Sequence, residues 1–206
     1  MSDIFKLTSD ASQNEVAIAQ VIAAIKGGQL AVIPTDTSYA LIADAFHSGA
    51  VTLLRMAKKQ SPEVPIPVAT ATIEMAHGIA KFSNLAMDLA QAFWPGPLTL
   101  LTHSQPSLKW PICDSRTALS IRVPHSEISQ QVLTGTGPAA MTGAQVAGQG
   151  VIENVERAIE ALGEKVAIYL DAGQLPATVS SVIDATTSNL RLVRQGAISL
   201  ESIRAV

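Results

Sequence analysis

The apolar positions of the chain follow two spacings, one typical of helices and one typical of short buried strands. Between residues 15 and 26, apolar side chains recur at helical spacing, which predicts a helix with an apolar face. Gly27 and Gly28 end this helix, and the apolar run at residues 30–33 before Pro34 predicts a buried strand. A helical pattern and a strand pattern therefore already follow each other within the first part of the chain.

The same two patterns continue along the rest of the chain. They predict helices at residues 50–59, 85–93, 128–133, 152–162 and 198–203. They predict strands at residues 66–70, 98–102, 119–123, 166–170, 179–183 and 190–193. Because strands and helices alternate, we expect an α/β fold with a twisted open sheet, parallel or mixed, in a single domain over residues 1–206.

Composition and charge exclude several classes of protein. Of the 206 residues, 48% are hydrophobic and only 15% are charged, which excludes a disordered chain. The net charge of −3 argues against a protein that coats nucleic acid, although it leaves room for a local basic groove. The single cysteine, Cys113, excludes an internal disulfide and a multi-cysteine zinc site, and we expect it to be a small packed residue.

The chain shows no pattern typical of a targeted or membrane-spanning protein. Its first ten residues lack an apolar segment of signal-peptide length. No apolar run approaches the roughly 18 residues that a membrane span requires. We therefore expect a cytoplasmic protein that does not associate with membranes.

Hydroxyl and carboxylate side chains follow the predicted strand at residues 30–33. Thr35, Asp36, Thr37 and Ser38 come directly after Pro34. Ligands of open α/β sheets bind beyond the carboxyl ends of strands, so this segment is a candidate binding site. The same residue types are also favoured in ordinary turns and helix caps, and spacing alone does not separate the two interpretations.

Two groups of basic residues are candidates for binding an anion. Arg55 and Lys58 share a helix face near the end of a predicted helix, where they would either bind phosphate or complement the helix dipole. Arg122 and Arg194 lie at the ends of two predicted strands. A guanidinium group there suits phosphate or carboxylate, although a surface ion pair is an equally simple explanation.

An uncharged segment at residues 128–152 contains five of the 13 glycines. Its position before a predicted helix is typical of a loop that cradles phosphate, but it matches neither the dinucleotide-binding nor the P-loop pattern. The four histidines show no metal-ligand spacing, and the chain has no Gly-Xaa-Ser-Xaa-Gly nucleophile motif. The sequence therefore gives little support to covalent catalysis or to zinc hydrolysis.

Together, several of these segments resemble the signature motifs of the YrdC-like family, the threonylcarbamoyl-adenylate synthases of tRNA modification. The matching segments are PTDTSYAL at 34–41, Lys58 with PIPV at 65–68, FWPGPLT at 93–99, SIRVP at 120–124, residues 138–148, SSVID at 180–184 and LVRQGAIS at 192–199. Their order and spacing agree with the family over most of the chain. The resemblance implies a twisted α/β sheet around a concave cavity.

The resemblance also implies a reaction, its substrates and a set of binding residues. ATP, expected with Mg²⁺, L-threonine and bicarbonate would yield threonylcarbamoyl-AMP and pyrophosphate, and a tRNA threonylcarbamoyl transferase would use the product. The protein would catalyse the reaction by positioning the substrates, with no catalytic nucleophile and no metal held by the protein. The implied substrate-binding residues are Thr35, Thr37, Arg122, Thr142, Gly143 and Ser180. The implied nucleotide-binding residues are Lys58, Gln60, Gln145 and Arg194.

Some positions of these motifs differ from the family pattern. Gln60 stands where the pattern has arginine, GAQVAG at 143–148 stands where it has SANxSG, and Ala40 replaces a glycine. Loss of one preorganised donor typically costs on the order of 10²–10³ in rate. Three hypotheses therefore stay open: a working synthase, a paralogue that binds nucleotide, tRNA or double-stranded RNA without synthesis, and a related carbamoyl-adenylate chemistry on another substrate.

Overall fold

The computed structural model describes residues 2–112 and 118–206. Cys113, which we expect to be packed, lies outside the described residues. The helices are α1 (Ala11–Lys26), α2 (Ser48–Lys58), α3 (Ile73–Ile79), α4 (Asn84–Phe93), α5 (Glu127–Thr136), α6 (Val155–Leu162), the 3-10 helix η1 (Gly163–Lys165) and α7 (Leu200–Arg204). The strands are β1 (Asp3–Lys6), β2 (Ala31–Pro34), β3 (Tyr39–Asp44), β4 (Val68–Ala69), β5 (Ala80–Lys81), β6 (Leu98–Ser104), β7 (Ala118–Arg122), β8 (Ala139–Gly143), β9 (Ile168–Asp171), β10 (Ser181–Asp184) and β11 (Arg191–Arg194).

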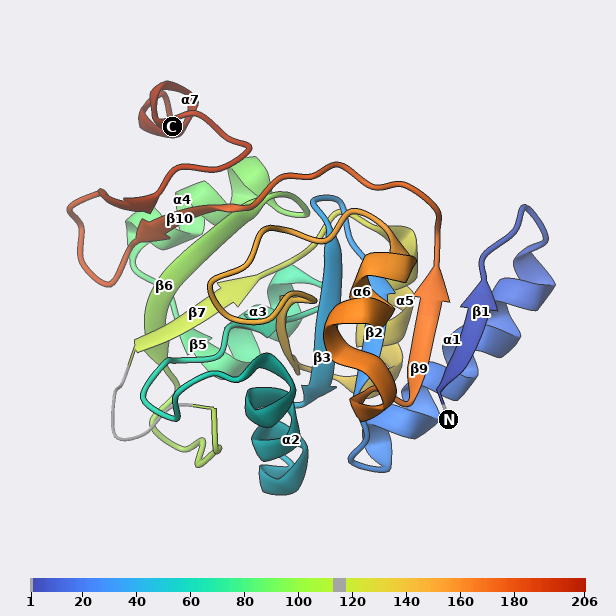
Figure 1. Ribbon diagram of the computed structural model, residues 1–206. Coiled ribbons are helices and arrows are strands. Elements are labelled where there is room, and N and C mark those ends of the chain that lie inside the picture. Colours follow the sequence, from blue (N-terminus) through green and yellow to red (C-terminus); the bar gives the residue numbers. More distant parts are fainter. Residues whose placement is uncertain (1, 113–117) are drawn as a thin grey trace.

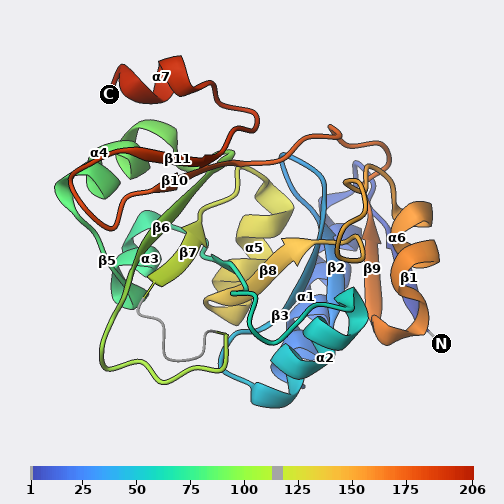
Figure 2. The ribbon, with the colours of Figure 1, turned by 60° about the vertical axis from the view of Figure 1, so that its left-hand side comes forward.

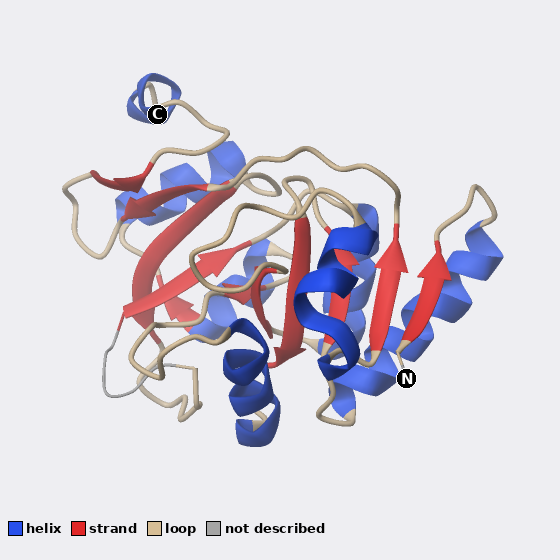
Figure 3. Ribbon diagram, viewed as in Figure 1, coloured by secondary structure: helices blue, strands red, loops and turns tan. Residues whose placement is uncertain are grey.

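All the described strands belong to one twisted sheet (Figures 1 and 3). The strand order is β1-β9-β2-β3-β8-β4-β7-β6-β10-β11, with β5 paired to β6. The pairs β1–β9, β9–β2, β4–β7 and β6–β10 are parallel, and the remaining pairs are antiparallel. The predicted α/β class with a mixed open sheet is therefore confirmed.

Apolar side chains cover both faces of the central strands. In β3, Leu41 and Ala43 belong to one hydrophobic cluster, whereas Ala40 and Ile42 belong to another. This alternation follows from the two-residue period of a strand and explains why β3 is apolar along nearly its whole length. Helices α1 and α5 pack on the face of Ile42, and α2 and α6 pack on the face of Leu41, as Figures 1 and 2 show.

Two central strands were not predicted by the sequence patterns. Strand β3 directly follows the turn at residues 35–38, so these residues form the turn of a β2–β3 hairpin rather than a loop before a helix. Strand β8 lies within the uncharged segment at residues 128–152 and pairs with β3 and β4. The prediction of a phosphate-cradling loop was therefore wrong for the part of this segment that forms β8. Alanine and glycine are poor strand formers, so the sequence pattern did not predict this strand.

Other predicted elements differ mainly at their boundaries. Strand β4 covers only Val68–Ala69 of the predicted 66–70, and α6 begins at Val155, later than predicted. The side chain of Asn154 accepts a hydrogen bond from the backbone N–H of Arg157 at 3.0 Å and so fixes the start of α6. The short elements β1, α3 and β5 were not predicted. In the described part of the chain, no helix is long and apolar enough to span a membrane.

Candidate functional site

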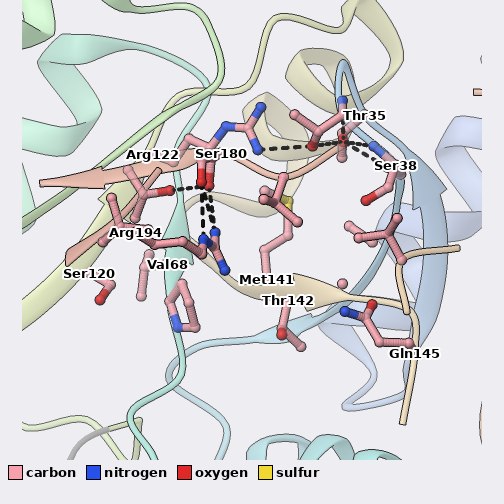
Figure 4. A pocket seen from close by; sticks show the side chains of 18 residues that line it. Thr35, Ser38, Val68, Ser120, Arg122, Met141, Thr142, Gln145, Ser180 and Arg194 are labelled. Atoms are coloured by element: carbon pink, nitrogen blue, oxygen red, sulfur yellow. Dashed lines mark hydrogen bonds between the residues drawn. The ribbon is translucent and has the colours of Figure 1, made fainter. Parts of the chain in front are cut away.

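A cavity of about 220 Å³ lies against the central strands of the sheet. Its walls come from β3, β4, β6, β7 and β8, from the β2–β3 turn and from residues 179–182, with Arg194 at one side (Figure 4). Among the residues that the structure describes, no aspartate or glutamate lines this cavity, whereas two arginines do. Nor does any group of three or more potential metal-ligand side chains occur in that part of the chain. The cavity therefore suits a small ligand with negative charge.

The β2–β3 turn places two threonine hydroxyls at the cavity. Thr35 Oγ1 donates to the carbonyl of Ser38 at 2.7 Å and accepts from the backbone N–H groups of Thr37 and Ser38 at 3.2 Å. Thr35 is thus mainly occupied in forming the turn. Its hydroxyl also lies 3.1 Å from Thr37 Oγ1, and both residues are buried. The turn interpretation and the binding interpretation of this segment are therefore compatible.

Arg122 is the buried cation of the cavity. It donates from Nε to the carbonyl of Gly96 at 2.9 Å, from one terminal nitrogen to Thr37 Oγ1 at 3.1 Å, and from the other to Asp36 Oδ1 at 2.7 Å. Burial lowers the pKa of Arg122, and the neighbouring carboxylate of Asp36 opposes this shift. Asp36 Oδ1 also accepts from the backbone N–H of His125 at 3.2 Å. Arg122 is therefore held in one orientation from three sides.

The segment between α4 and β6 supplies one of these three contacts. Trp94 Nε1 donates to the carbonyl of Leu98 at 2.6 Å, and the backbone N–H of Gly96 donates to the carbonyl of Val123 at 2.9 Å. A Cβ at Gly96 would overlap the carbonyl of Phe93, so the chain turns here only with glycine. The motif FWPGPLT thus positions the carbonyl of Gly96, which accepts a hydrogen bond from Arg122.

Ser180 and Arg194 form a second polar group on the cavity wall. Ser180 Oγ lies 2.8 Å from Thr99 Oγ1 of β6 and accepts from Arg194 at 3.2 Å. Arg194 also donates twice to the carbonyl of Ser180, at 3.2 and 2.9 Å. Partial burial lowers the pKa of Arg194. Figure 4 shows Arg194 and Ser180 on the same side of the cavity as Arg122.

The backbone around Gly196 keeps Arg194 beside Ser180. The N–H of Ala197 donates to the carbonyl of Val179 at 2.9 Å, and Ser181 Oγ accepts from the N–H of Gly196 at 2.9 Å. A Cβ at Gly196 would overlap backbone atoms of Val179 and Ser180. Close approach of the two backbone segments therefore requires glycine at this position.

Lys58 lies behind the wall of the cavity rather than among its lining residues. Its ammonium donates to the carbonyls of Gly143 at 2.6 Å and of Gln145 at 2.5 Å, and its own carbonyl accepts from the N–H of Ala147 at 2.9 Å. The residue is 4% exposed, and burial lowers the pKa of Lys58 to about 8. Lys58 thus fixes the end of β8 and the segment after it, where Thr142, Gly143 and Gln145 line the cavity.

The structure separates Gln60 from the other predicted site residues. Gln60 lines a different surface cavity together with Arg55 and Lys59, next to α2. Arg55 donates to three backbone carbonyls, including that of Val64 at 2.6 Å, and so supports the loop after α2. The predicted phosphate clamp on one face of α2 therefore does not form, because Arg55 and the ammonium of Lys58 contact different segments of the chain.

The remaining predicted residues meet around one cavity. They are Thr35, Thr37, Arg122, Thr142, Gly143, Gln145, Ser180 and Arg194. Sequence reasoning missed Thr99 and Ser120, which also line it, and Asp36 as the partner of Arg122. Thr99 lies in the motif FWPGPLT and Ser120 in the motif SIRVP. Their positions within these motifs could have identified both as candidate site residues.

The fold and the cavity define a class of protein: a mixed-sheet α/β protein with buried arginine and hydroxyl groups around a cavity for a small anionic ligand. The Sua5/YciO/YrdC family model, described as "Telomere recombination", matches residues 23–196. The chain belongs to this family.

Individual relatives agree with this assignment. The chain is 36% identical over 208 residues to a Mycobacterium leprae protein named "Putative threonylcarbamoyl-AMP synthase", covering all of this chain and 94% of that one. The crystal structure of P. abyssi Sua5 complexed with L-threonine superposes with a TM-score of 0.89 at 26% identity. This chain is covered in full and spans 60% of that Sua5 chain. E. coli YciO shares the fold, with a TM-score of 0.89 at 22% identity over 98% of this chain and all of that one.

Proposed function

We propose that this protein synthesises threonylcarbamoyl-AMP from ATP, bicarbonate and L-threonine. The observation that carries the proposal is the buried Arg122, held by Asp36 and Thr37 at the cavity. A guanidinium has five N–H donors, and three are used within the protein, which leaves one on each terminal nitrogen. These two donors can bind the carboxylate of an amino acid or the mixed anhydride formed from it.

The size and lining of the cavity fit the threonine part of the reaction. Its volume of about 220 Å³ is below the roughly 300–1,000 Å³ of sites for drug-sized ligands, and suits an amino acid better than a whole nucleotide. Thr37 and Ser180 each supply a hydroxyl group to the cavity lining, and Thr142 supplies a third. The L-threonine bound to P. abyssi Sua5 supports this assignment by similarity.

The nucleotide would extend out of this cavity past Arg194 and the segment after β8. Arg194 can pair with phosphate, and Gly143 and Gln145 line the wall along which the phosphates would run. Mg²⁺ would arrive with the ATP phosphates, since within the described part of the chain the cavity lining contains no carboxylate to hold the ion. Gln60 would contact the nucleotide only beyond the cavity.

The chemistry requires positioning rather than a protein nucleophile. The threonine amine attacks the carbon of bicarbonate and gives a carbamate, with loss of water. A carbamate oxygen then attacks the α-phosphorus of ATP, and pyrophosphate leaves. The side chains around the cavity would orient the reacting groups and stabilise the negative charge on the phosphates. The absence of a Ser-His or Cys-His pair among the described lining residues is consistent with this mechanism.

The product is a mixed anhydride, which is reactive and must be passed on. We assign its use to a tRNA threonylcarbamoyl transferase, which would attach the threonylcarbamoyl group to adenosine 37 of tRNA. Because both ATP and tRNA are cytoplasmic, we place the reaction in the cytoplasm. The whole reaction would take place in the single domain expected over residues 1–206.

A second candidate function is binding of nucleotide, tRNA or double-stranded RNA without synthesis. The specific observation in its favour is Lys58, whose ammonium is occupied by the carbonyls of Gly143 and Gln145 instead of facing the cavity. Only 14 lysines and arginines occur in the chain, so RNA binding would be modest and would weaken steeply with added salt.

The test is pyrophosphate release by the purified protein, with and without L-threonine and bicarbonate. Release that requires both substrates would establish the synthase. ATP binding without release would establish the binding function instead, and release with another amino acid in place of threonine would indicate a related chemistry on a different substrate. The same assay is applied to Arg122→Ala, which should release no pyrophosphate. Arg191→Ala is its matched control, because Arg191 is exposed and pairs with Asp184 away from the cavity.

A further inference from the structure

Thr99 lies in the wall of the cavity, between the strands that bring Arg122 and Ser180 to it. Its strand, β6, has β7 on one side and β10 on the other, and Thr99 pairs with Val182 of β10. Arg122 is the last residue of β7, and Ser180 comes directly before β10. Thr99 is 6% exposed and its side chain lines the cavity. A buried hydroxyl group therefore stands next to both of these site residues.

The hydroxyl groups of Thr99 and Ser180 share one hydrogen bond. Their oxygen atoms are 2.8 Å apart, and both residues are buried. Each hydroxyl has one proton and two lone pairs. Within the described part of the chain, Thr99 Oγ1 has no other hydrogen-bond partner, and Ser180 Oγ has only Arg194 besides, at 3.2 Å. One of the two protons therefore lies between the two oxygens, and the other is available to a ligand.

Arg194 determines which hydroxyl keeps the available proton when the ligand is an anion. A guanidinium group only donates, so Arg194 occupies one lone pair of Ser180 Oγ. If Thr99 donates to the other lone pair, the Ser180 hydroxyl can only donate, and its proton lies beside the positive charge of Arg194. An anionic ligand oxygen is most stable at that position, because it meets a donor and a cation together. In the residues that the structure describes, Thr99 itself bonds to no cation.

We propose that Thr99 is a positioning residue, which donates to Ser180 and so makes the Ser180 hydroxyl an obligatory donor to the carboxylate of the bound amino acid. A hydroxyl with both lone pairs occupied cannot accept from an ammonium group. Thr99 thereby also determines which end of the amino acid faces Ser180. The proposal rests on the proposed function for the choice of L-threonine as ligand, and it adds the direction of the hydrogen bond at Ser180.

A double-mutant cycle in the full-length protein tests this coupling. Calorimetry measures L-threonine binding to the wild type, Thr99→Val, Ser180→Ala and the double variant. Thr99→Val keeps the size and branching of the side chain and should weaken binding about threefold to tenfold, because Ser180 loses its fixed orientation. Ser180→Ala removes the bond to the carboxylate and should cost about tenfold or more. The double variant should bind within about twofold of Ser180→Ala, because Thr99 acts only through Ser180.

Thr102→Val is the matched control on the same strand. Thr102 is fully buried and donates to the carbonyl of Leu119 at 3.4 Å, and it points to the opposite face of the sheet from Thr99. Its L-threonine affinity should equal that of the wild type. Thr99→Ser keeps the hydroxyl and should stay within about twofold of the wild type. Urea unfolding shows that each variant is folded, and Thr99→Ala takes the place of Thr99→Val if the latter does not fold.

ATP binding separates a positioning role from a disturbed cavity. Thr99→Val leaves the contacts of Arg194 with Ser180 in place, so its ATP affinity should equal that of the wild type. An equal loss of affinity for ATP and L-threonine would overturn the proposal. Effects that add in the double variant would also overturn it, as would a larger loss in Thr99→Val than in Ser180→Ala, which would make Thr99 the direct donor.

The pyrophosphate assay separates this inference from the proposed function. Wild-type protein that releases pyrophosphate with L-threonine, while Thr99 and Ser180 act independently, would retain the function and overturn the positioning role. Wild-type protein that binds L-threonine with the expected coupling, yet releases no pyrophosphate, would support the positioning role and overturn the synthase. A wild type that does not bind L-threonine would overturn both.

Discussion

Arg122 donates a hydrogen bond of 2.7 Å to Asp36, and their side chains are only 9% and 14% exposed. The two residues are 86 positions apart in the chain and meet because β7 ends beside the β2–β3 turn. Asp36 therefore orients the one buried guanidinium in the cavity lining of the described chain. This pair connects the stability of the fold to the proposed binding of threonine.

Replacement of Arg122 should affect both stability and activity. In Arg122→Ala the carboxylate of Asp36 stays buried without its partner, which should lower the free energy of unfolding by about 3–5 kcal/mol. Threonine-dependent pyrophosphate release should fall to background. Chemical denaturation and the pyrophosphate assay measure the two effects.

The exposed pair of Arg191 and Asp184 provides the control for Arg122. The side chain of Arg191 is 73% exposed, so Arg191→Ala should change the free energy of unfolding by no more than about 1 kcal/mol and leave turnover unchanged. Undiminished turnover in folded Arg122→Ala would contradict the proposal that Arg122 binds the carboxylate of threonine. Arg122→Lys, which keeps the charge but loses the planar set of donors, should recover stability better than turnover.

Replacement of Arg194 should affect nucleotide binding more than stability. Arg194 is an exposed residue at one side of the cavity, and within the described part of the chain its side-chain hydrogen bonds all go to Ser180. Arg194→Ala should weaken ATP binding about tenfold or more in calorimetry, while the unfolding midpoint changes little. An equal loss of affinity for L-threonine and for ATP would show that Arg194 acts through Ser180 instead.

Gly196 is required for the close approach of two backbone segments. In Gly196→Ala the new methyl group would overlap Val179 and Ser180, so we expect a loss of about 1–3 kcal/mol in the free energy of unfolding. Because Ser180 and Arg194 would shift as well, affinity for ATP should also fall. Gly78→Ala in α3 is the control: its Cβ meets no atom within 4 Å, and it should be neutral or slightly stabilising. Equal stability of Gly196→Ala and Gly78→Ala would contradict the overlap.

Lys58 should make stability and binding depend on pH. Burial lowers the pKa of Lys58 to about 8, from 10.5. Between these two values the folded protein binds fewer protons at Lys58 than the unfolded chain does. The contribution of Lys58 to the free energy of unfolding should therefore rise with pH through this window and stay constant below it.

Lys58→Met provides the comparison for this pH dependence. Urea unfolding of the wild type and of Lys58→Met at about pH 7 and about pH 9.5 should show a difference that moves in favour of the wild type at the higher pH. ATP affinity of the wild type should fall over the same window, because the positive charge behind Gly143 and Gln145 is lost. A parallel fall of affinity in Lys58→Met would assign the effect to another group.

The sequence by itself determined the class of fold and the positions of most helices. The period of apolar residues places α1 and α4 within a few residues of their observed bounds. Residues three and four positions apart lie on the same face of a helix, so the spacing of apolar residues alone identifies the buried face. The motifs around Arg122 and Ser180 also marked the cavity, because they lie at strand ends that the fold brings together.

Only the tertiary structure decided which side chains face the cavity and which support it. Strand β8 contains two alanines and a glycine, and its pairing with β3 and β4 depends on long-range contacts, so its local sequence does not predict it. For the same reason, spacing along α2 could not show that Lys58 turns to the carbonyls of Gly143 and Gln145, or that Gln60 lies at another cavity. Local periodicity specifies helices and apolar faces, whereas contacts between residues far apart in the chain specify the site.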